Sequence, residues 1–227
     1  MSTYREIIYM ILDEIKISID DAFFTEDHVI YLVDNYRALI LKQKYSDVKK
    51  QIPKSNYQTI CLDLIEVPAI SGEPCEGGSY LRSREKVPFL MQIGAPRVYP
   101  IDYYQGEITY VSRERMRYVG YNKYLQNIIY CSIGPDGYLY FKSSNPQYLY
   151  LREARMDGIF EKPSSAFKLQ CSDSSNCNIL DMEFPLEESL IPVVIELVIK
   201  NLLAANYRPE DNENNAKDDL AGASVRE

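Results

Sequence analysis

The sequence predicts an α+β fold in which an N-terminal helical hairpin and a C-terminal helix pack with an antiparallel β-sheet domain. Apolar residues recur at helical spacing in residues 1–52 and again in residues 185–206. Between them, residues 53–184 carry runs of alternating apolar and polar side chains with the period of β-strands. Helices and strands segregated in this way are typical of the α+β class. A length of 227 residues with 46% hydrophobic side chains is sufficient for an extensive core.

Two helices are predicted in the first 52 residues. The first, in TYREIIYMILDEIKI, places these apolar residues at helical spacing: Tyr4, Ile7, Ile8, Ile11 and Ile15. After the acidic break SIDDAFF, Thr25 can act as the N-cap of a second helix, and Glu26 and Asp27 suit its first turn because the helix dipole favours acids there. This helix is expected to end near Tyr45, with a buried face made by Val29, Leu32, Val33, Tyr36 and Ile40.

From Gln58 the period changes to that of strands. TICLDLIEV predicts a strand, and the Gly/Pro-rich stretch SGEPCEGGS predicts a mobile loop near residues 71–80. KVPFLMQI, PRVYPIDYY and GEITYVS are predicted to be extended, and the prolines in the first two suit sheet edges and turns. RERMRYVGYNKY predicts either a short helix or an irregular basic connection.

The clearest local signal is a hairpin in IIYCSIGPDGYLYFKSS. Two β-rich runs flank Gly-Pro-Asp-Gly at residues 134–137, where proline restricts φ and glycine allows a positive φ. A third strand is expected in QYLYLREARMDGIFEKP, and alternation along these strands predicts a ladder of tyrosines on one sheet face. Because tyrosine is enriched at protein interfaces, the predicted interface residues are Tyr138, Tyr140, Tyr148 and Tyr150.

Residues 185–206 contain the most apolar segment of the chain, and they predict a helix rather than a membrane span. A span needs roughly 20 mostly apolar residues, whereas Glu196 and Lys200 interrupt this run. Apolar residues cover most of the helix surface, so more than one neighbour must bury it. With Ser189 as N-cap, Pro192 lies in the first turn; a start near Leu186 with a kink, or a buried strand, are the alternatives.

Few residues of this chain are candidates for catalysis or for binding metals and cofactors. His28 is the single histidine, and the phosphate-binding glycine motifs, the nucleophile elbow and the zinc-protease motif are missing from the sequence. No pair of carboxylates stands out as an acid–base pair. We therefore predict no catalytic, metal-binding or cofactor-binding residues. Five cysteines without metal-ligand spacing, and no signal peptide, predict reduced thiols in a reducing compartment.

Charge is distributed unevenly along the chain. The net charge of −8 argues against general nucleic-acid binding. From Arg82 to Lys123, eight basic and four acidic side chains give +4, whereas from Asn206 onward three basic and six acidic side chains give −3. Opposed patches allow head-to-tail association that closes into a ring, although ordinary solvated charge is the alternative.

Residues 207–227 predict an acidic flexible tail. Basic residues beside the Gly-rich loop are candidates for protein docking or for non-specific phosphate contact in a DNA channel: Arg82, Arg84 and Lys86.

Five stretches carry a resemblance to a known family over nearly the whole chain. They are REIIYMILDEI, TEDHVIYLVDNYRALILKQ, QTICLDL, ARMDGIFEKP and FPLEESLIPVVIELVIKNLLAANYRPEDNENNAKDDLA. Their order resembles that of the head-to-tail ring proteins of crAss-like tailed phages.

The resemblance implies a non-enzymatic virion protein, made in the host cytoplasm, that forms a homo-oligomeric ring of the head-to-tail connector. Such rings are usually twelvefold, contact the portal protein and other connector or tail rings, and let DNA pass. No catalytic residue is carried over, and no membrane contact is implied. The alternative is an accessory protein that binds a ligand or glycan through the tyrosine-rich sheet face.

Overall fold

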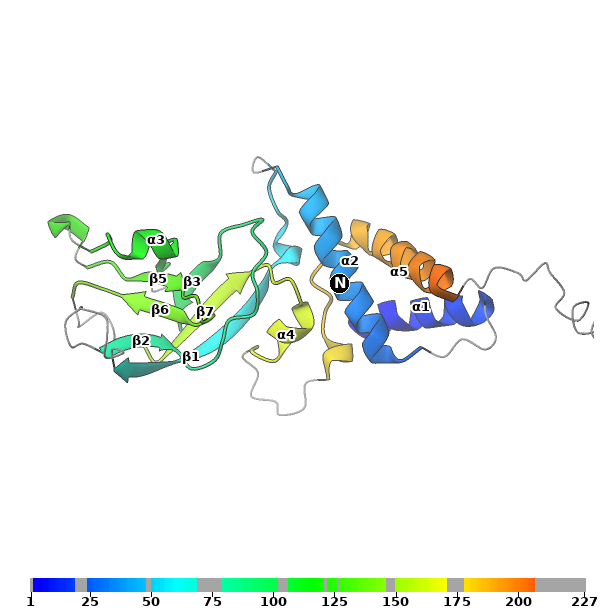
Figure 1. The fold of residues 1–227 in the computed structure, drawn as a ribbon, viewed down its shortest axis with the longest axis horizontal. Coiled ribbons are helices and arrows are strands. Elements are labelled where there is room, and N and C mark those ends of the chain that lie inside the picture. The colour runs from blue at the N-terminus through cyan, green and yellow to red at the C-terminus, as the bar shows by residue number, and fades with distance from the viewer. Residues whose placement is uncertain are drawn as a thin grey trace, which may run out of the picture.

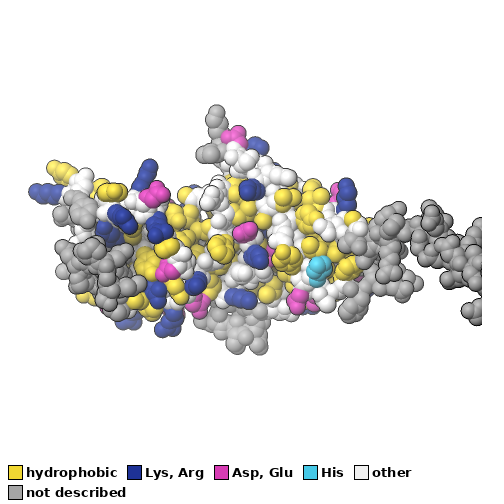
Figure 2. Space-filling view, in the orientation of Figure 1, with side chains coloured by type: hydrophobic (Ala, Val, Ile, Leu, Met, Phe, Trp, Pro, Cys, Tyr) yellow, Lys and Arg dark blue, Asp and Glu magenta, His cyan; other side chains and the backbone are white. Residues whose placement is uncertain are grey.

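The computed structural model shows a helical body and a β-body arranged end to end along the long axis of the molecule (Figure 1). It describes residues 2–18, 24–47, 50–68, 79–101, 106–120, 122–125, 127–145, 150–170 and 178–206. The helical body consists of α1 (Tyr4–Ser18), α2 (Glu26–Lys44) and α5 (Ile191–Asn206). Lys and Arg side chains gather over the β-body in the view of Figure 2. The predicted α+β class is confirmed.

The two N-terminal helices form as predicted. The five apolar residues predicted for the first helix are all at most 1% exposed. Thr25 has the extended backbone of an N-cap, but its side chain makes no capping hydrogen bond. Its carbonyl oxygen instead accepts hydrogen bonds from the amides of His28 and Val29. On α2, Leu32 and Tyr36 are only partly buried, because the helix directs the polar side chains of Asp34 and Arg37 into the interior.

Helix α5 begins later than its predicted cap. A 3₁₀ turn, Glu188–Leu190, precedes it, so Pro192 falls in the first turn as predicted. Ser189 is not the N-cap, because it lies inside that turn and donates its hydroxyl hydrogen to Glu187 at 2.8 Å. The kinked start near Leu186 and the buried strand are not adopted. Both α1 and α2 pack against α5, which confirms that more than one neighbour buries it.

The β-body is a seven-stranded sheet in the order β3-β7-β1-β2-β6-β5-β4. Its strands are β1 (Gln58–Pro68), β2 (Ser79–Ser83), β3 (Arg97–Pro100), β4 (Thr109–Tyr110), β5 (Tyr130–Ile133), β6 (Leu139–Lys142) and β7 (Glu153–Gly158). The edge strand β3 ends in a proline, as predicted for proline-containing segments. Near the two edges, the Ile108 amide donates to the Val98 carbonyl oxygen at 2.7 Å, which curls the sheet toward a closed barrel.

The sheet differs from the prediction in one pairing. Strands β4 and β5 are parallel, whereas the other described strand pairs are antiparallel. A parallel pair needs a crossover connection. The predicted irregular or helical basic stretch supplies it, as α3 (Arg113–Met116) and the 3₁₀ turn η3 (Lys123–Leu125).

The predicted hairpin is confirmed, but the third strand is elsewhere. The Gly134 amide donates to the Tyr138 carbonyl oxygen at 2.8 Å, and Gly137 adopts a positive φ of 84°. Strand β7 starts only at Glu153 and pairs with β1 and β3, not with β6. Most of the predicted mobile loop lies outside the described residues, and its last part, from Ser79, already belongs to β2.

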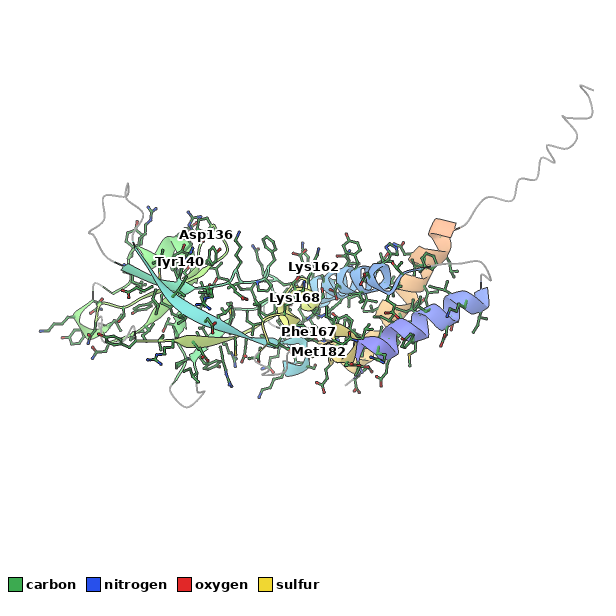
Figure 3. The ribbon with its side chains drawn as sticks, turned by 90° about the horizontal axis from the view of Figure 1, so that it is seen from below. Asp136, Tyr140, Lys162, Phe167, Lys168 and Met182 are labelled. Atoms are coloured by element: carbon green, nitrogen blue, oxygen red, sulfur yellow. The ribbon has the colours of Figure 1, made fainter. Side chains whose placement is uncertain are left out.

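A buried polar network joins the two bodies. Arg37 of α2 is fully buried and donates hydrogen bonds to the carbonyl oxygens of Pro185 at 2.8 Å, Phe160 at 2.9 Å and Asn56 at 3.2 Å. Asp34, one turn earlier, accepts from the Tyr4 hydroxyl at 2.6 Å and from Ser164 at 2.7 Å. The junction also contains α4 (Pro163–Phe167), which lies between the bodies near Met182 (Figures 1 and 3).

At this junction, burial shifts the pKa values of two charged side chains, and their hydrogen-bond and charge partners oppose the shift. Burial lowers the pKa of Arg37 to about 10, while nearby Tyr4 and Asp34 act in the opposite direction. Burial raises the pKa of Asp34, against the lowering effects of the hydrogen bonds from Tyr4 and Ser164 and of the Arg37 charge. Such a network is costly to leave incomplete, so it holds the helical body and the β-body in one arrangement.

Candidate interaction surfaces

Strand pairing brings some of the predicted interface tyrosines together with some of the predicted basic residues on the outer face of the β-body. Arg82 of β2 lies opposite Tyr140 of β6, and their sheet neighbours Leu81 and Phe141 point into the interior. The Arg82 guanidinium carbon lies 4.1 Å from the Tyr138 ring centroid, and Lys86 Nζ lies 5.7 Å from the same centroid. We name the following five residues the hairpin cluster: Arg82, Lys86, Asp136, Tyr138 and Tyr140.

Asp136 completes the hairpin cluster from the turn. Its carboxylate accepts a hydrogen bond of 2.5 Å from the Tyr140 hydroxyl and lies 3.8 Å from an Arg82 nitrogen. Figure 3 shows Asp136 and Tyr140 side by side in the β-body. Burial and the Asp136 carboxylate raise the pKa of Tyr140. A cation–π contact at a partly exposed position contributes about 0.5–1 kcal/mol, so the cluster stabilises the hairpin tip.

The predicted ladder of four tyrosines is not a continuous row. Tyr150 precedes β7 and is 87% exposed, and Tyr148 lies outside the described residues. The ladder fails because β1 and β2 separate β7 from β6 in the sheet order. A ligand- or glycan-binding face built on such a row is therefore not favoured. The role of the four tyrosines in protein contacts stays a prediction.

The three predicted basic residues also separate. Arg84 is exposed, and its guanidinium lies 3.7 Å from the carboxylate of Asp63 on β1. Arg82 and Lys86 instead turn toward Tyr138. These residues are close together in the sequence. Their different partners follow from the cross-strand register, which the sequence pattern does not indicate.

A second surface lies at the free end of the β-body. Helix α3 and the 3₁₀ turn η3 present exposed basic side chains together with Tyr118, which is 80% exposed, and Tyr124, which is 90% exposed. We name the following six residues the basic end: Arg113, Arg115, Arg117, Tyr118, Lys123 and Tyr124. Its charges are visible in the sequence, but no pattern there marks these residues as a separate surface.

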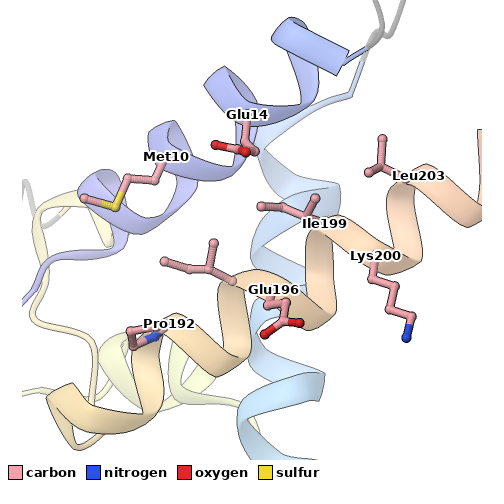
Figure 4. Close-up of a pocket in the computed structure, with 8 residues that line it drawn as sticks. Met10, Glu14, Pro192, Glu196, Ile199, Lys200 and Leu203 are labelled. Carbon is pink, nitrogen blue, oxygen red and sulfur yellow. The ribbon is translucent and has the colours of Figure 1, made fainter.

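A third surface is an open apolar groove between α1 and α5 on the helical body (Figure 4). Its volume is about 660 Å³. Met10 on one wall is 60% exposed, and Glu196 and Lys200, the charged residues that interrupt the apolar run, are exposed as well. The lining residues are Met10, Glu14, Pro192, Ile195, Glu196, Ile199, Lys200 and Leu203.

The described residues contain no cluster of three or more His, Cys, Asp or Glu side chains that could hold a metal ion. His28 is exposed and stacks on Phe24, with ring centroids 6.3 Å apart.

The prediction of reduced thiols is wrong for Cys61, which is disulfide-bonded. Cys131 is a free thiol in the interior of the β-body, and burial raises its pKa. Within the part of the chain that the structure describes, no helix is long and apolar enough to cross a membrane.

Exposed aromatic side chains and an open apolar groove are typical of surfaces through which proteins contact one another. The sequence profile of phage tail ring protein 2 matches residues 6–220. Ring protein 2 of Bacteroides phage crAss001 is 62% identical over 223 residues, which cover 97% of this chain and 99% of that relative. The chain therefore belongs to the phage tail ring protein 2 family of crAss-like phages.

Family membership confirms the resemblance that the sequence predicted. A phage tail ring protein is a structural protein of the virion, and a ring implies assembly of several copies with other tail proteins. This membership indicates a structural role.

Proposed function

We propose that this protein forms one ring of the head-to-tail connector, between the portal protein and the tail, and that DNA passes through the ring. The observation that carries the proposal is the family match over residues 6–220, which includes both the helical body and the β-body. The whole described fold, rather than one part of it, is therefore the ring subunit.

The surfaces of the subunit support assembly on more than one side. Large apolar side chains are exposed on both bodies, including Met10 and Ile17 on α1 and Phe89 and Tyr124 on the β-body. A subunit in a closed ring contacts one neighbour on each side through two different surfaces. Apolar groups at separate places on the molecule suit such contacts, and further ones suit the rings above and below.

We propose twelve copies in the ring, because a ring that receives its symmetry from a portal needs the copy number of that portal. The portal protein and the next connector or tail ring are the proposed partners along the axis. The buried network around Arg37 supports this role, since it fixes the relation between the bodies and lets each body serve a different contact.

Contact with DNA in the channel is the weaker part of the proposal. Arg84 and Lys86 have exposed side chains, whereas Arg82 lies over Tyr138 and near Asp136. The Asp63 carboxylate partly offsets the Arg84 charge. A net charge of −8 also disfavours tight binding of phosphates, and this suits a channel that DNA must traverse without being held.

The proposal is tested by measuring mass with light scattering for the purified chain alone and after addition of purified portal protein. Negative-stain microscopy of the same samples then shows whether rings form on the portal. We expect a complex that contains about twelve chains of 26.3 kDa in addition to the portal mass. A chain that remains monomeric both alone and with the portal contradicts the connector role.

A further inference from the structure

The basic end carries charge that no described residue neutralises. Its four cationic side chains are exposed, and none forms an ion pair with a side chain in the described ranges: Arg113, Arg115, Arg117 and Lys123. Glu114 is the acid within this stretch, so the local charge is four minus one, or +3. Tyr118 and Tyr124 add two exposed rings beside these charges. The combination fits an acidic polypeptide that also carries some apolar side chains.

The basic end is held in place by the strand behind it. Lys142 of β6 donates to the carbonyl oxygen of Met116 at 3.3 Å, and the Ser144 hydroxyl donates to the carbonyl oxygen of Gly120. Gly120 has a φ of 92°, and a Cβ there would lie 2.5 Å from Ser144 Oγ. Glycine is therefore needed at this position for both conformation and space. A surface fixed in this way loses little entropy when a partner binds.

The same chain carries a segment of complementary charge after α5. Residues 210–219 contain five acids and one base, which gives −4: Glu210, Asp211, Glu213, Lys217, Asp218 and Asp219. Leu220 follows directly. The family profile extends to residue 220, so this acidic segment belongs to the region that the family shares.

The two complementary parts belong to opposite ends of the molecule. Helix α3 lies at the end of the β-body, whereas the C-terminal end of α5, where the acidic segment is attached, lies at the far end of the helical body (Figure 1). Contact within one chain would require the segment to run back along both bodies. Contact between chains places the attachment point of one copy toward the β-body of the next. Repeated head-to-tail contacts of this kind close into a ring when the rotation allows.

We propose that the acidic segment, residues 210–219, of one copy docks on the basic end of the neighbouring copy. The inference rests on the proposed ring and names the contact that links its subunits. Duplex DNA is a poorer occupant, because the chain as a whole is strongly acidic and the acidic segment competes for the same cations.

Sedimentation velocity of the full-length chain tests this contact at low and high salt. We expect the wild type to self-associate at low salt and to dissociate at high salt. Arg115→Glu/Arg117→Glu changes the charge of the basic end from +3 to −1, and Asp218→Lys/Asp219→Lys changes that of the acidic segment from −4 to 0. Each should weaken association by about tenfold or more, because each removes the charge complementarity of the contact. The control Lys42→Glu/Lys54→Glu makes the same charge change at exposed positions away from the basic end and should associate like the wild type.

Mixing the two charge-reversed variants decides between contacts within and between chains. An equimolar mixture should recover association, because the unchanged acidic segment of the Arg115→Glu/Arg117→Glu chain can dock on the unchanged basic end of the Asp218→Lys/Asp219→Lys chain. No recovery, or a wild type that stays monomeric at low salt, overturns the inference. Fluorescence anisotropy with a labelled DNA duplex gives a further test: if the Arg115→Glu/Arg117→Glu change abolishes duplex binding but leaves self-association unaltered, the basic end is a DNA site.

The inference and the proposed function fail separately. If both variants form rings on the portal as the wild type does, the docking contact is wrong while the connector role stands. If charge reversal and mixing behave as expected but the portal recruits no rings, the contact stands and the connector role is wrong.

Discussion

The guanidinium of Arg37 donates a hydrogen bond of 2.9 Å to the carbonyl oxygen of Phe160, and this contact ties the middle of α2 to the core of the β-body. The same side chain reaches the carbonyl oxygens of Pro185 and Asn56. A single buried cation therefore serves three backbone segments that are distant in sequence. The relation between the two bodies depends on it.

Arg37→Leu is expected to lower the free energy of unfolding by about 3–5 kcal/mol, because it leaves buried carbonyl oxygens and the Asp34 carboxylate without their cationic partner. Urea unfolding followed by circular dichroism measures the change. Arg5→Leu is the matched control, since Arg5 pairs with Asp181 at 2.8 Å but both side chains are largely exposed. It should cost less than about 1 kcal/mol. Equal losses for the two variants would refute the role of Arg37.

Asp34→Asn tests the buried carboxylate through the pH dependence of stability. Burial raises the pKa of Asp34, so between its unfolded and folded values the native state binds a proton that the unfolded state does not. The contribution of the Asp34 carboxyl to the free energy of unfolding is therefore greatest at acidic pH, and it is lost as the pH rises through the pKa of the folded state. The stability of the wild type relative to Asp34→Asn should fall as the pH rises from about 4, the ordinary pKa of an aspartate, through the raised pKa of the folded state. A constant difference across urea titrations in this range would show that the carboxyl does not titrate as expected.

Replacing the four predicted interface tyrosines by serine should leave the monomer folded and impair particle assembly. Single variants separate a tyrosine that is exposed from one that stabilises the hairpin. Tyr150→Ser should not change the melting temperature, because the side chain is 87% exposed. Tyr138→Ser should cost about 0.5–1 kcal/mol, because Arg82 and Lys86 both lose their contact with the aromatic ring. Incorporation into particles is measured by quantitative blotting, and unchanged incorporation of the fourfold variant removes these tyrosines from the interface.

Gly120→Ala is expected to destabilise the basic end more than Gly106→Ala destabilises its own loop. Both glycines have a positive φ, of 92° and 90°, so alanine is strained at either position by about 1–2 kcal/mol. A Cβ on Gly120 additionally meets Ser144 Oγ at 2.5 Å, whereas one on Gly106 meets no described atom within 4 Å. Thermal unfolding measures both variants. Adding Ser144→Ala should recover part of the loss in Gly120→Ala only, and a failure to do so would argue against the close approach.

Truncation after Tyr207 is expected to preserve the melting temperature while reducing incorporation into particles. The described core residues all precede this position, so the core is left intact. Ordering the removed segment costs roughly 1–2 kcal/mol of backbone entropy per residue, which only a partner along its length offsets. Limited proteolysis should cut after Pro209 in the isolated chain and not in the virion. Unfolding of the truncated chain would show that the segment belongs to the core.

Sequence alone determined the elements whose signal is local. The helical spacing of apolar residues identified the buried face of α1 from Tyr4 to Ile15, and the Gly-Pro-Asp-Gly turn identified the β5–β6 hairpin. The family resemblance was also present in the sequence. The helix and the hairpin turn depend on residues a few positions apart, where period and turn chemistry are sufficient.

Only the tertiary structure decided which distant segments meet. Alternation predicted a strand near residue 153 but not its place between β3 and β1, and that place separates Tyr150 from the hairpin cluster. Cross-strand register placed Arg82 opposite Tyr140, where its guanidinium lies over the Tyr138 ring, while Arg84 lies near Asp63. Helical periodicity does not mark Arg37 as buried, because it records polarity and not available partners. Its burial is favourable only where backbone carbonyl groups from three other segments converge, and the packing of both bodies creates that place.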